Sequence, residues 1–245
     1  MRVAVAGGTG MVGRPVVVEL EKAGHEPVVL ARSQGVDLTS GIGLAERLAG
    51  CDAIIDVTNR LTTSRAKSTA FFTQVTGNLV AAAKEASVGH VIVLSIVGVD
   101  RVAYGYYQGK RAQEQLLENG GVPWTVLRAT QFFELPQSLL AHRFPIAAMP
   151  KMLSQPVDTT DVALALVDLV EAGPTGYATP IAGPEQLQMV DMARRIEHAR
   201  GSRRPVLPIP VPGKVGRQLA TGGLVPDGEY VHGKRTFDEY LSTLR

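Results

Sequence analysis

The 245-residue chain has little of the features that would assign it directly to a specialised class. It has a single cysteine, Cys51, so an intrachain disulfide is excluded and a reducing compartment is the simplest setting. Its formal net charge is only +2, with both signs spread along the chain, which argues against the basic stripe of a nucleic-acid binder. Its five histidines, among them His142, show no metal-ligand spacing, and we expect no bound metal.

The sequence also lacks targeting and membrane signals. The apolar run at the N-terminus is only a few residues long and leads directly into glycines, whereas a signal peptide needs a longer apolar core. No stretch reaches the apolar length that spans a bilayer. We therefore expect a cytoplasmic protein that binds a small-molecule substrate and has neither a membrane nor a nucleic-acid partner. Its oligomeric state is left open.

Short β-branched runs alternate with amphipathic stretches through the first half of the chain. Hydrophobic residues make up 45% of the sequence, enough for a large core without a disulfide or metal. This alternation predicts an α/β fold of the Rossmann type, with a doubly wound parallel sheet. The expected strands are 3–6, 27–30, 53–57, 91–94 and 124–127, and the expected helices are 12–23, 44–48, 69–87 and 106–118.

The rhythm changes after about residue 130. Residues 131–155 show no clear period, whereas 159–171 and 183–200 look helical. We expect one NAD(P)-binding domain over residues 1–245. Within it, about 1–130 would form the dinucleotide-binding core, and about 131–245 would add a small substrate lobe at the carboxyl ends of the strands.

A glycine-rich turn follows the first expected strand. Gly7, Gly10 and Gly13 end that strand and open a helix, which is the context a dinucleotide-binding turn needs. The first glycine permits the tight turn, the second lets the backbone approach a pyrophosphate, and the third allows close packing of the helix. The alternative is an ordinary glycine-rich turn. The predicted cofactor contacts here are Gly7, Thr9, Gly10, Met11, Val12 and Gly13.

The end of the second expected strand indicates which cofactor binds. NAD sites usually place a carboxylate there, whereas NADP sites use arginine. Here Arg32 and Ser33 follow the strand, no carboxylate stands at its tip, and Arg14 is a possible second cation. A guanidinium matches a 2′-phosphate in charge and geometry, so the sequence favours NADP(H) over NAD(H). The alternative is that Arg32 is a solvated loop residue.

Ser95, Tyr106 and Lys110 form a second candidate group. Ser95 ends an expected strand, and the Tyr-x-x-x-Lys spacing puts Tyr106 and Lys110 on one helix face. We expect the lysine to lower the tyrosine pKa, so that the phenol exchanges a proton with a carbonyl or alcohol oxygen, and Ser95 to bind the same oxygen. Lys110 is also a candidate to hold the nicotinamide ribose. The alternative is an amphipathic helix with a solvated lysine, and the adjacent Tyr107 leaves the assignment of the tyrosine open.

These motifs together resemble a known superfamily. The segments GGTGMVG, VLAR, VLSIVGVD, YYQGKRAQEQLL and WTVLRATQFFE are similar to the atypical short-chain dehydrogenases/reductases, in particular the NmrA-like and NAD(P)H-binding branch. The resemblance implies that Thr58 and Asn59 lie beside the adenosine ribose and pyrophosphate. It also implies that Thr130 contacts the cofactor. The same segment would line the substrate site with Gln131, Phe132 and Phe133.

Two functions follow as hypotheses. The first is an NADPH-dependent oxidoreductase that transfers hydride to a small, fairly apolar carbonyl, enone or quinone. The second is a non-catalytic NADP(H)-binding redox sensor of the NmrA type, because the resembling branch includes such proteins. An epimerase or dehydratase is less favoured, since those chains tend to be longer.

Overall fold

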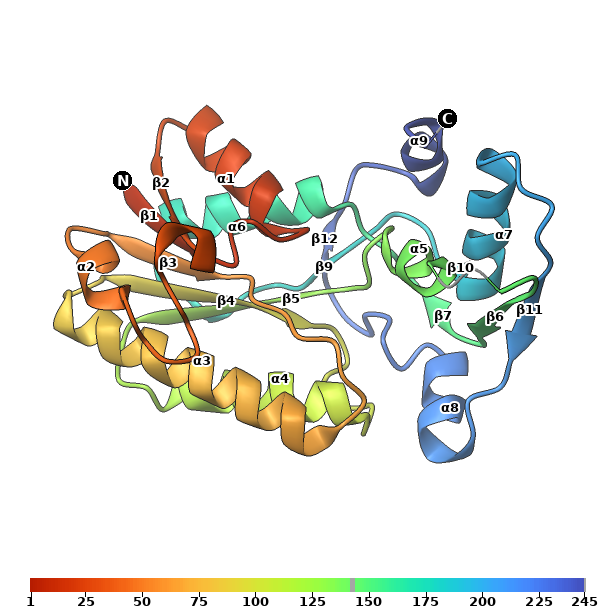
Figure 1. The fold of residues 1–245 in the computed structure, drawn as a ribbon, viewed down its shortest axis with the longest axis horizontal. Coiled ribbons are helices and arrows are strands. Elements are labelled where there is room, and N and C mark those ends of the chain that lie inside the picture. Colours follow the sequence, from red (N-terminus) through yellow and green to blue (C-terminus); the bar gives the residue numbers. More distant parts are fainter. Residues whose placement is uncertain (142–143, 245) are drawn as a thin grey trace. The chain divides into compact units, whose positions relative to one another are not determined.

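A computed structural model describes residues 1–141 and 144–244 (Figure 1). The chain separates into two compact units that interleave along the sequence. Unit 1 comprises Met1–Ser95, Tyr104–Arg128 and Val162–Thr179. Unit 2 comprises the described residues of Ile96–Ala103, Ala129–Asp161 and Pro180–Arg245.

Unit 1 is built on parallel strands. Its strands follow the order β5-β4-β3-β1-β2, and the β1–β2, β1–β3 and β3–β4 pairs are parallel; β8 pairs with β5. The elements, some of which end just beyond the unit, are β1 (Arg2–Ala6), α1 (Gly13–Lys22), β2 (Glu26–Leu30), the 3-10 helix η1 (Arg32–Gln34), α2 (Leu44–Leu48), β3 (Ala53–Asp56), α3 (Arg65–Glu85), β4 (His90–Ile96), α4 (Gly105–Glu118), β5 (Trp124–Ala129), α6 (Thr159–Ala172) and β8 (Gly176–Tyr177).

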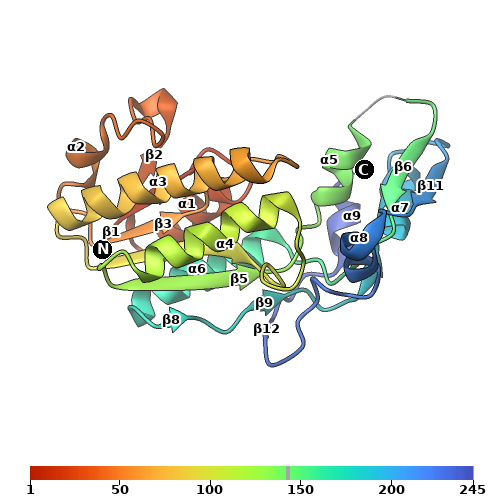
Figure 2. The same ribbon diagram turned by 90° about the horizontal axis from the view of Figure 1, so that it is seen from below.

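Helices cover both faces of this sheet. Figure 1 shows α1 and α6 on one face and α3 and α4 on the other, and Figure 2 shows α3 and α4 lying side by side. Residues Val3 to Ala6 are fully buried, as expected for a central parallel strand that is covered on both faces. At the amino-terminal edge of the sheet, His90 is buried at the start of β4 and its Nε2 lies 2.8 Å from the Thr125 hydroxyl.

The strand order reverses direction between β1 and β3. The loops that follow these two strands therefore leave the same edge of the sheet on opposite sides, which is where open α/β sheets bind ligands. At the other end of the order, β2 is the last strand, and no strand of the described chain pairs with its outer side.

Unit 2 contains shorter elements. β6 pairs with β11 in parallel, β7 pairs with β10 antiparallel, and β9 pairs with β12 and with Ala129. The rings of Phe133, Phe237 and Tyr240 pack together, with centroids 5.2–5.7 Å apart. The elements are α5 (Leu135–Leu140), β6 (Ala147–Pro150), β7 (Leu153–Ser154), β9 (Ile181–Ala182), β10 (Leu187–Gln188), α7 (Met189–Ala199), β11 (Val206–Ile209), α8 (Gly213–Ala220), β12 (Val231–His232) and α9 (Phe237–Ser242).

The predicted Rossmann-type sheet is confirmed, with shifts at element ends. α3 begins at Arg65 rather than at 69, because the Ser64 hydroxyl accepts a hydrogen bond from the Lys67 N–H and caps the helix. The segment 131–155, which lacked a clear period, contains α5, β6 and β7. Most of α6 belongs to unit 1, although it lies beyond residue 130. None of the described helices is long and apolar enough to cross a bilayer.

Candidate functional site

The glycine-rich turn joins β1 to α1. Gly7 has φ +81°, a conformation that side chains disfavour, and a Cβ on Gly13 would lie 2.1 Å from the Gly7 carbonyl oxygen. These two glycines therefore let α1 start directly against the end of β1. No described residue accepts a hydrogen bond from the N–H groups of Met11 or Val12. Unpaired amides at a helix N-terminus favour a phosphate group.

Two arginines lie near the turns that follow β1 and β2. The Nε of Arg14 donates to the Thr9 carbonyl at 3.0 Å and so stabilises the glycine-rich turn. Arg32 and Ser33 are exposed in η1, directly after β2. The pKa of Asp37 is lowered, mainly by hydrogen bonds from Thr39 and to a smaller extent by the charge of Arg32.

The loop after β3 packs against the glycine-rich turn. A Cβ on Gly7 would lie 3.3 Å from the Thr58 backbone, so the two loops are in close contact. The Thr58 N–H donates to Asp56 Oδ1 at 2.8 Å, which fixes the start of the loop. Thr58 is buried, whereas Asn59, the next residue, is exposed.

Tyr106 reaches this loop from α4. Its phenol donates to Asn59 Oδ1 at 2.8 Å, and its ring lies edge-on to Phe72 with centroids 5.9 Å apart. The structure thus places Tyr106, rather than Tyr107, beside a predicted cofactor loop. Burial raises the pKa of Tyr106, and the expectation that Lys110 lowers it is wrong, because the lysine charge is directed elsewhere.

Lys110 is buried, with 4% of its surface exposed. Its Nζ donates to Gln113 Oε1 at 2.7 Å and lies 4.6 Å from the centre of the Phe72 ring. Burial lowers its pKa to about 8, although the charges of Asp56 and Glu114 oppose this shift. A buried lysine that titrates near neutrality is uncommon and is typical of functional sites.

An amide bridges Lys110 to a buried carboxylate. The Nε2 of Gln113 donates to Asp56 Oδ2 at 2.9 Å and to the Thr76 hydroxyl at 3.1 Å. Burial raises the pKa of Asp56, while the charge of Lys110 counteracts this. A carboxylate on a buried strand needs a partner, but the sequence does not identify Gln113 as the partner of Asp56. The position of Gln113 seven residues after Tyr106 and three after Lys110, on the same helix face, was the available signal.

Ser95 lies near the end of β4. The β3–β4 register pairs Asp56 with Val93, and alternation along the strand puts Ser95 on the same face as Val93, which packs with α3 residues. The Ser95 hydroxyl is buried and has no hydrogen-bond partner among the described residues. A buried hydroxyl without a partner points to a bound polar atom.

Four predicted site residues belong to unit 2. Thr130 Oγ1 donates to the Gln155 carbonyl at 2.6 Å, and Gln131 Oε1 accepts from Ser154 Oγ at 2.8 Å. The Nε2 of Gln131 is buried without a partner among the described residues. Phe132 is half-buried, whereas Phe133 is 1% exposed and belongs to the aromatic core of this unit.

The described residues contain no group of three His, Cys, Asp or Glu side chains that would hold a metal ion. His142, one of the five histidines, lies outside the described residues.

Sequence comparison identifies a family and two relatives. A family model described as NAD(P)H-binding matches residues 34–172, more than half of the chain. A (4-alkanoyl-5-oxo-2,5-dihydrofuran-3-yl)methyl phosphate reductase of Streptomyces griseus is 29% identical over 219 residues, covering 81% of this chain and 74% of that protein. An NAD(P)H azoreductase of Xenophilus azovorans is 26% identical over 250 residues, covering 92% and 82%.

Solved structures with this fold include different kinds of enzyme. An NADPH-dependent quinone oxidoreductase from Escherichia coli, complexed with NADPH, matches with a TM-score of 0.72 and 20% identity over 99% of each chain. A UDP-glucose 4-epimerase from Thermus thermophilus, complexed with NAD, matches with a TM-score of 0.74 and 19% identity, covering 98% of this chain and 99% of that one. At these identities the likeness shows the fold alone.

Proposed function

The chain belongs to the NAD(P)H-binding family, and from this premise we propose that it is an NADPH-dependent oxidoreductase that reduces a small, fairly apolar carbonyl, enone or quinone. The observation that carries the proposal is the placement of the Tyr106 phenol. It is hydrogen-bonded to Asn59, on the loop that packs against the glycine-rich turn. The Tyr106 phenol, the proton donor in this proposal, thus bonds to a loop that contacts the turn whose free amides suit a dinucleotide pyrophosphate.

The cofactor residues fit NADP(H) in their chemistry. The unpaired amides of Met11 and Val12 would hold the pyrophosphate, and the exposed guanidinium of Arg32 would pair with the 2′-phosphate. Thr58 and Asn59 would line the adjacent part of the site. When bound, NADPH supplies the hydride.

In this proposal Tyr106, Ser95 and Lys110 each have a separate role. Because burial raises its pKa, Tyr106 keeps its proton at neutral pH and can donate it to the substrate oxygen as the neighbouring carbon is reduced. The unpartnered hydroxyl of Ser95 would donate a hydrogen bond to the same oxygen. The Lys110 ammonium, held by Gln113, would bind the nicotinamide ribose rather than act on the phenol.

The names of the relatives support reduction rather than sensing. Both the furanone phosphate reductase and the azoreductase are named for reactions that consume reducing equivalents. Within unit 2, the amide Nε2 of Gln131 is buried without a partner among the described residues, which suits the substrate-binding role proposed for Gln131. A non-catalytic redox sensor remains the competing function.

The chain's single cysteine supports our further proposal of a cytoplasmic location.

Two experiments test this function. Calorimetric titration with NADPH, NADP+, NADH and NAD+ should show preference for the phosphorylated pair, and Arg32→Ala should abolish that preference. NADPH oxidation with a panel of quinones and carbonyls should then fall by about 10²–10⁴-fold in Tyr106→Phe. Tyr107→Phe, the neighbouring phenol on the same helix, serves as the matched control and should retain turnover. Tight NADPH binding without turnover on any acceptor would instead support the sensor.

A further inference from the structure

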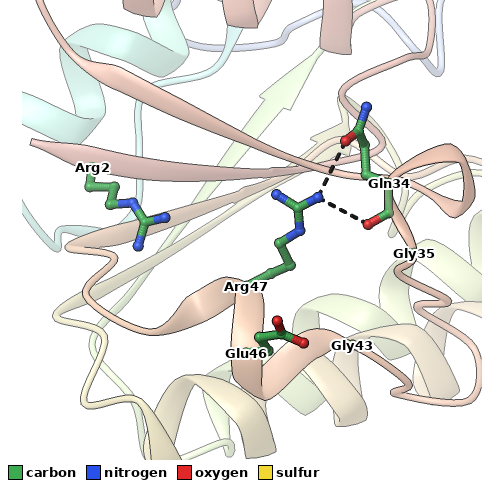
Figure 3. A pocket seen from close by; sticks show the side chains of 6 residues that line it. All are labelled: Arg2, Gln34, Gly35, Gly43, Glu46 and Arg47. Carbon is green, nitrogen blue, oxygen red and sulfur yellow. Dashed lines mark hydrogen bonds between the residues drawn. The ribbon is translucent and has the colours of Figure 1, made fainter.

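A polar pocket lies beside η1, between that turn and α2. Its volume is about 380 Å³, and its lining residues all belong to unit 1 (Figure 3). Two guanidinium groups line the pocket, and that of Arg47 contacts the turn that carries Arg32 and Ser33. The lining residues are Arg2, Gln34, Gly35, Gly43, Glu46 and Arg47.

Arg47 binds the last residue of η1 at two points. Its Nη2 donates to the Gln34 backbone carbonyl at 3.1 Å and to Gln34 Oε1 at 3.3 Å, as the dashed lines in Figure 3 show. A charged guanidinium makes stronger hydrogen bonds than a neutral donor. The side chain of Gln34 and its main chain are therefore held by one group.

The helix that carries Arg47 is itself anchored. Leu44 and Leu48, which flank Arg47 in α2, are 2% and 0% exposed and are part of the core of unit 1. The start of α2 also fits tightly against the end of η1, because a Cβ on Gly43 would lie 2.5 Å from the Gly35 carbonyl oxygen. Arg47 thus connects the turn to a fixed element.

The turn needs such support because β2 is the last strand of its sheet. In the common dinucleotide-binding order, another strand lies outside the second one, whereas no described strand does so here. What remains within the turn is a few backbone bonds, such as Gly35 N–H to the Arg32 carbonyl at 3.1 Å and Val36 N–H to the Ala31 carbonyl at 3.2 Å.

We propose that Arg47 is a positioning residue for cofactor selection: by holding Gln34 it fixes the conformation of η1 in which Arg32 and Ser33 meet the 2′-phosphate of NADPH. This rests on the proposed cofactor preference. A turn that is held in the bound conformation loses less conformational entropy when the phosphate binds, so its support adds to affinity for NADPH. NADH has no 2′-phosphate and gains nothing from the held turn.

Selectivity separates this role from general stability. A change that only loosens unit 1 weakens NADPH and NADH alike, so the ratio of their dissociation constants stays the same. Arg47→Met should lower the preference for NADPH over NADH by about tenfold, as expected for one or two lost hydrogen bonds, with NADH affinity nearly unchanged. Gln34→Ala removes only the side-chain acceptor and should lower the preference for NADPH over NADH by less than Arg47→Met does. Hydrogen exchange of the Gly35 and Val36 amides should speed up in Arg47→Met without cofactor.

Two controls separate geometry from charge. Arg2→Met removes a guanidinium from the same pocket, but Arg2 bonds Glu26 and the Ala49 carbonyl, so the preference should not change. Arg47→Lys keeps the positive charge but cannot span both oxygens of Gln34, so most of the loss should persist. Full selectivity in Arg47→Lys would overturn positioning and assign the effect to charge.

The proposed function and the positioning role fail in different ways. If Arg32→Ala leaves the preference for NADPH over NADH unchanged, the cofactor preference assigned to that turn is wrong. If Arg32→Ala lowers the preference while Arg47→Met does not, the cofactor site stands and the role of Arg47 is overturned.

Discussion

Lys110 and Asp56 are two buried, opposite charges that share one amide. Gln113 accepts from the ammonium at 2.7 Å and donates to the carboxylate at 2.9 Å. This bridge connects the helix of the proposed proton donor to the strand whose loop contacts the glycine-rich turn. Burial lowers the pKa of Lys110 and raises that of Asp56, and the charge of each group opposes the shift of the other.

The activity of the protein should therefore decline in mildly alkaline solution. The pKa of Lys110 is lowered to about 8 by burial, so the ammonium loses its proton, and its charge, as the pH rises through that value. Tyr106, with its raised pKa, stays protonated over this range. We expect kcat/KM for NADPH-dependent reduction to fall above about pH 8.

Asp56→Asn tests the assignment of that titration. The charge of Asp56 raises the pKa of Lys110. Without that charge the Lys110 pKa falls further, so the alkaline limb of the activity profile should move to lower pH. Asp52→Asn, which changes an exposed carboxylate, is the control and should leave the limb in place. If the alkaline limb lies at the same pH in the wild type, Asp56→Asn and Asp52→Asn, a group other than Lys110 causes it.

Asn59 should act by orienting the phenol of Tyr106, from which it accepts a hydrogen bond. Asn59→Ala leaves Tyr106 without its 2.8 Å partner, and we expect kcat to fall by about tenfold because the phenol is less well oriented. In the Tyr106→Phe background the same change should cost much less. A double-mutant cycle on kcat measures this coupling. If Asn59→Ala lowers kcat equally in the wild-type and Tyr106→Phe backgrounds, Asn59 does not act through the phenol.

Gly13→Ala should damage the glycine-rich turn. The new methyl group would lie 2.1 Å from the Gly7 carbonyl oxygen, so α1 must move away from β1. We expect the free energy of unfolding to fall by about 2–3 kcal/mol and NADPH binding to be lost. Gly89→Ala is the control, because its Cβ would meet only the Asp52 carbonyl at an ordinary 3.5 Å. Urea unfolding and calorimetry report the two effects, and normal binding by Gly13→Ala would contradict this account of the turn.

His90 should make the protein less stable in mild acid. Burial lowers its pKa to about 4 from 6.5, so below pH 6.5 the unfolded chain takes up a proton that the folded one does not. Folding stability is then lost as the pH falls from about 6.5 towards 4, by up to ~3 kcal/mol. His90→Gln removes the titration while keeping a polar group near Thr125.

The comparison is made between the pH dependences of unfolding, since other groups titrate in the same window. The wild-type protein should lose more stability between pH 7 and pH 4.5 than His90→Gln. Parallel curves for wild type and His90→Gln would place the His90 pKa near its ordinary value.

The parts of the fold that were predictable are those governed by local rules. Runs such as Val3 to Ala6 are apolar at every position because the strands are covered on both sides, and Gly7 and Gly13 mark the turn because a side chain does not fit there. The two- to four-residue strands of unit 2 carry too few positions to show a period, and their pairing joins distant segments, as between Val206 and Ala147.

The placement of Tyr106 and Lys110 on one helix face was predictable, but the electrostatics around them was not. Spacing placed Tyr106 and Lys110 on one face of α4, as observed. The direction of the lysine depends on Asp56, 54 residues earlier, and on Gln113, so the pKa of the tyrosine could not be read from its neighbours in sequence. Arg47 was missed for the same reason, because its partner Gln34 is defined only by how α2 packs.

The exposed position of β2 has a consequence for how the protein behaves at high concentration. Glu26 N–H and the Leu30 carbonyl bond towards β1, so the intervening Pro27 directs its backbone nitrogen outwards, where it has no hydrogen to donate. An exposed strand edge with a full set of donors invites the same strand of another molecule to add on, and such additions lead to aggregation. Pro27, the second residue of this five-residue strand, interrupts that set. Replacing it with valine would keep the β-strand character of the segment and turn the edge of the sheet into a surface for self-association.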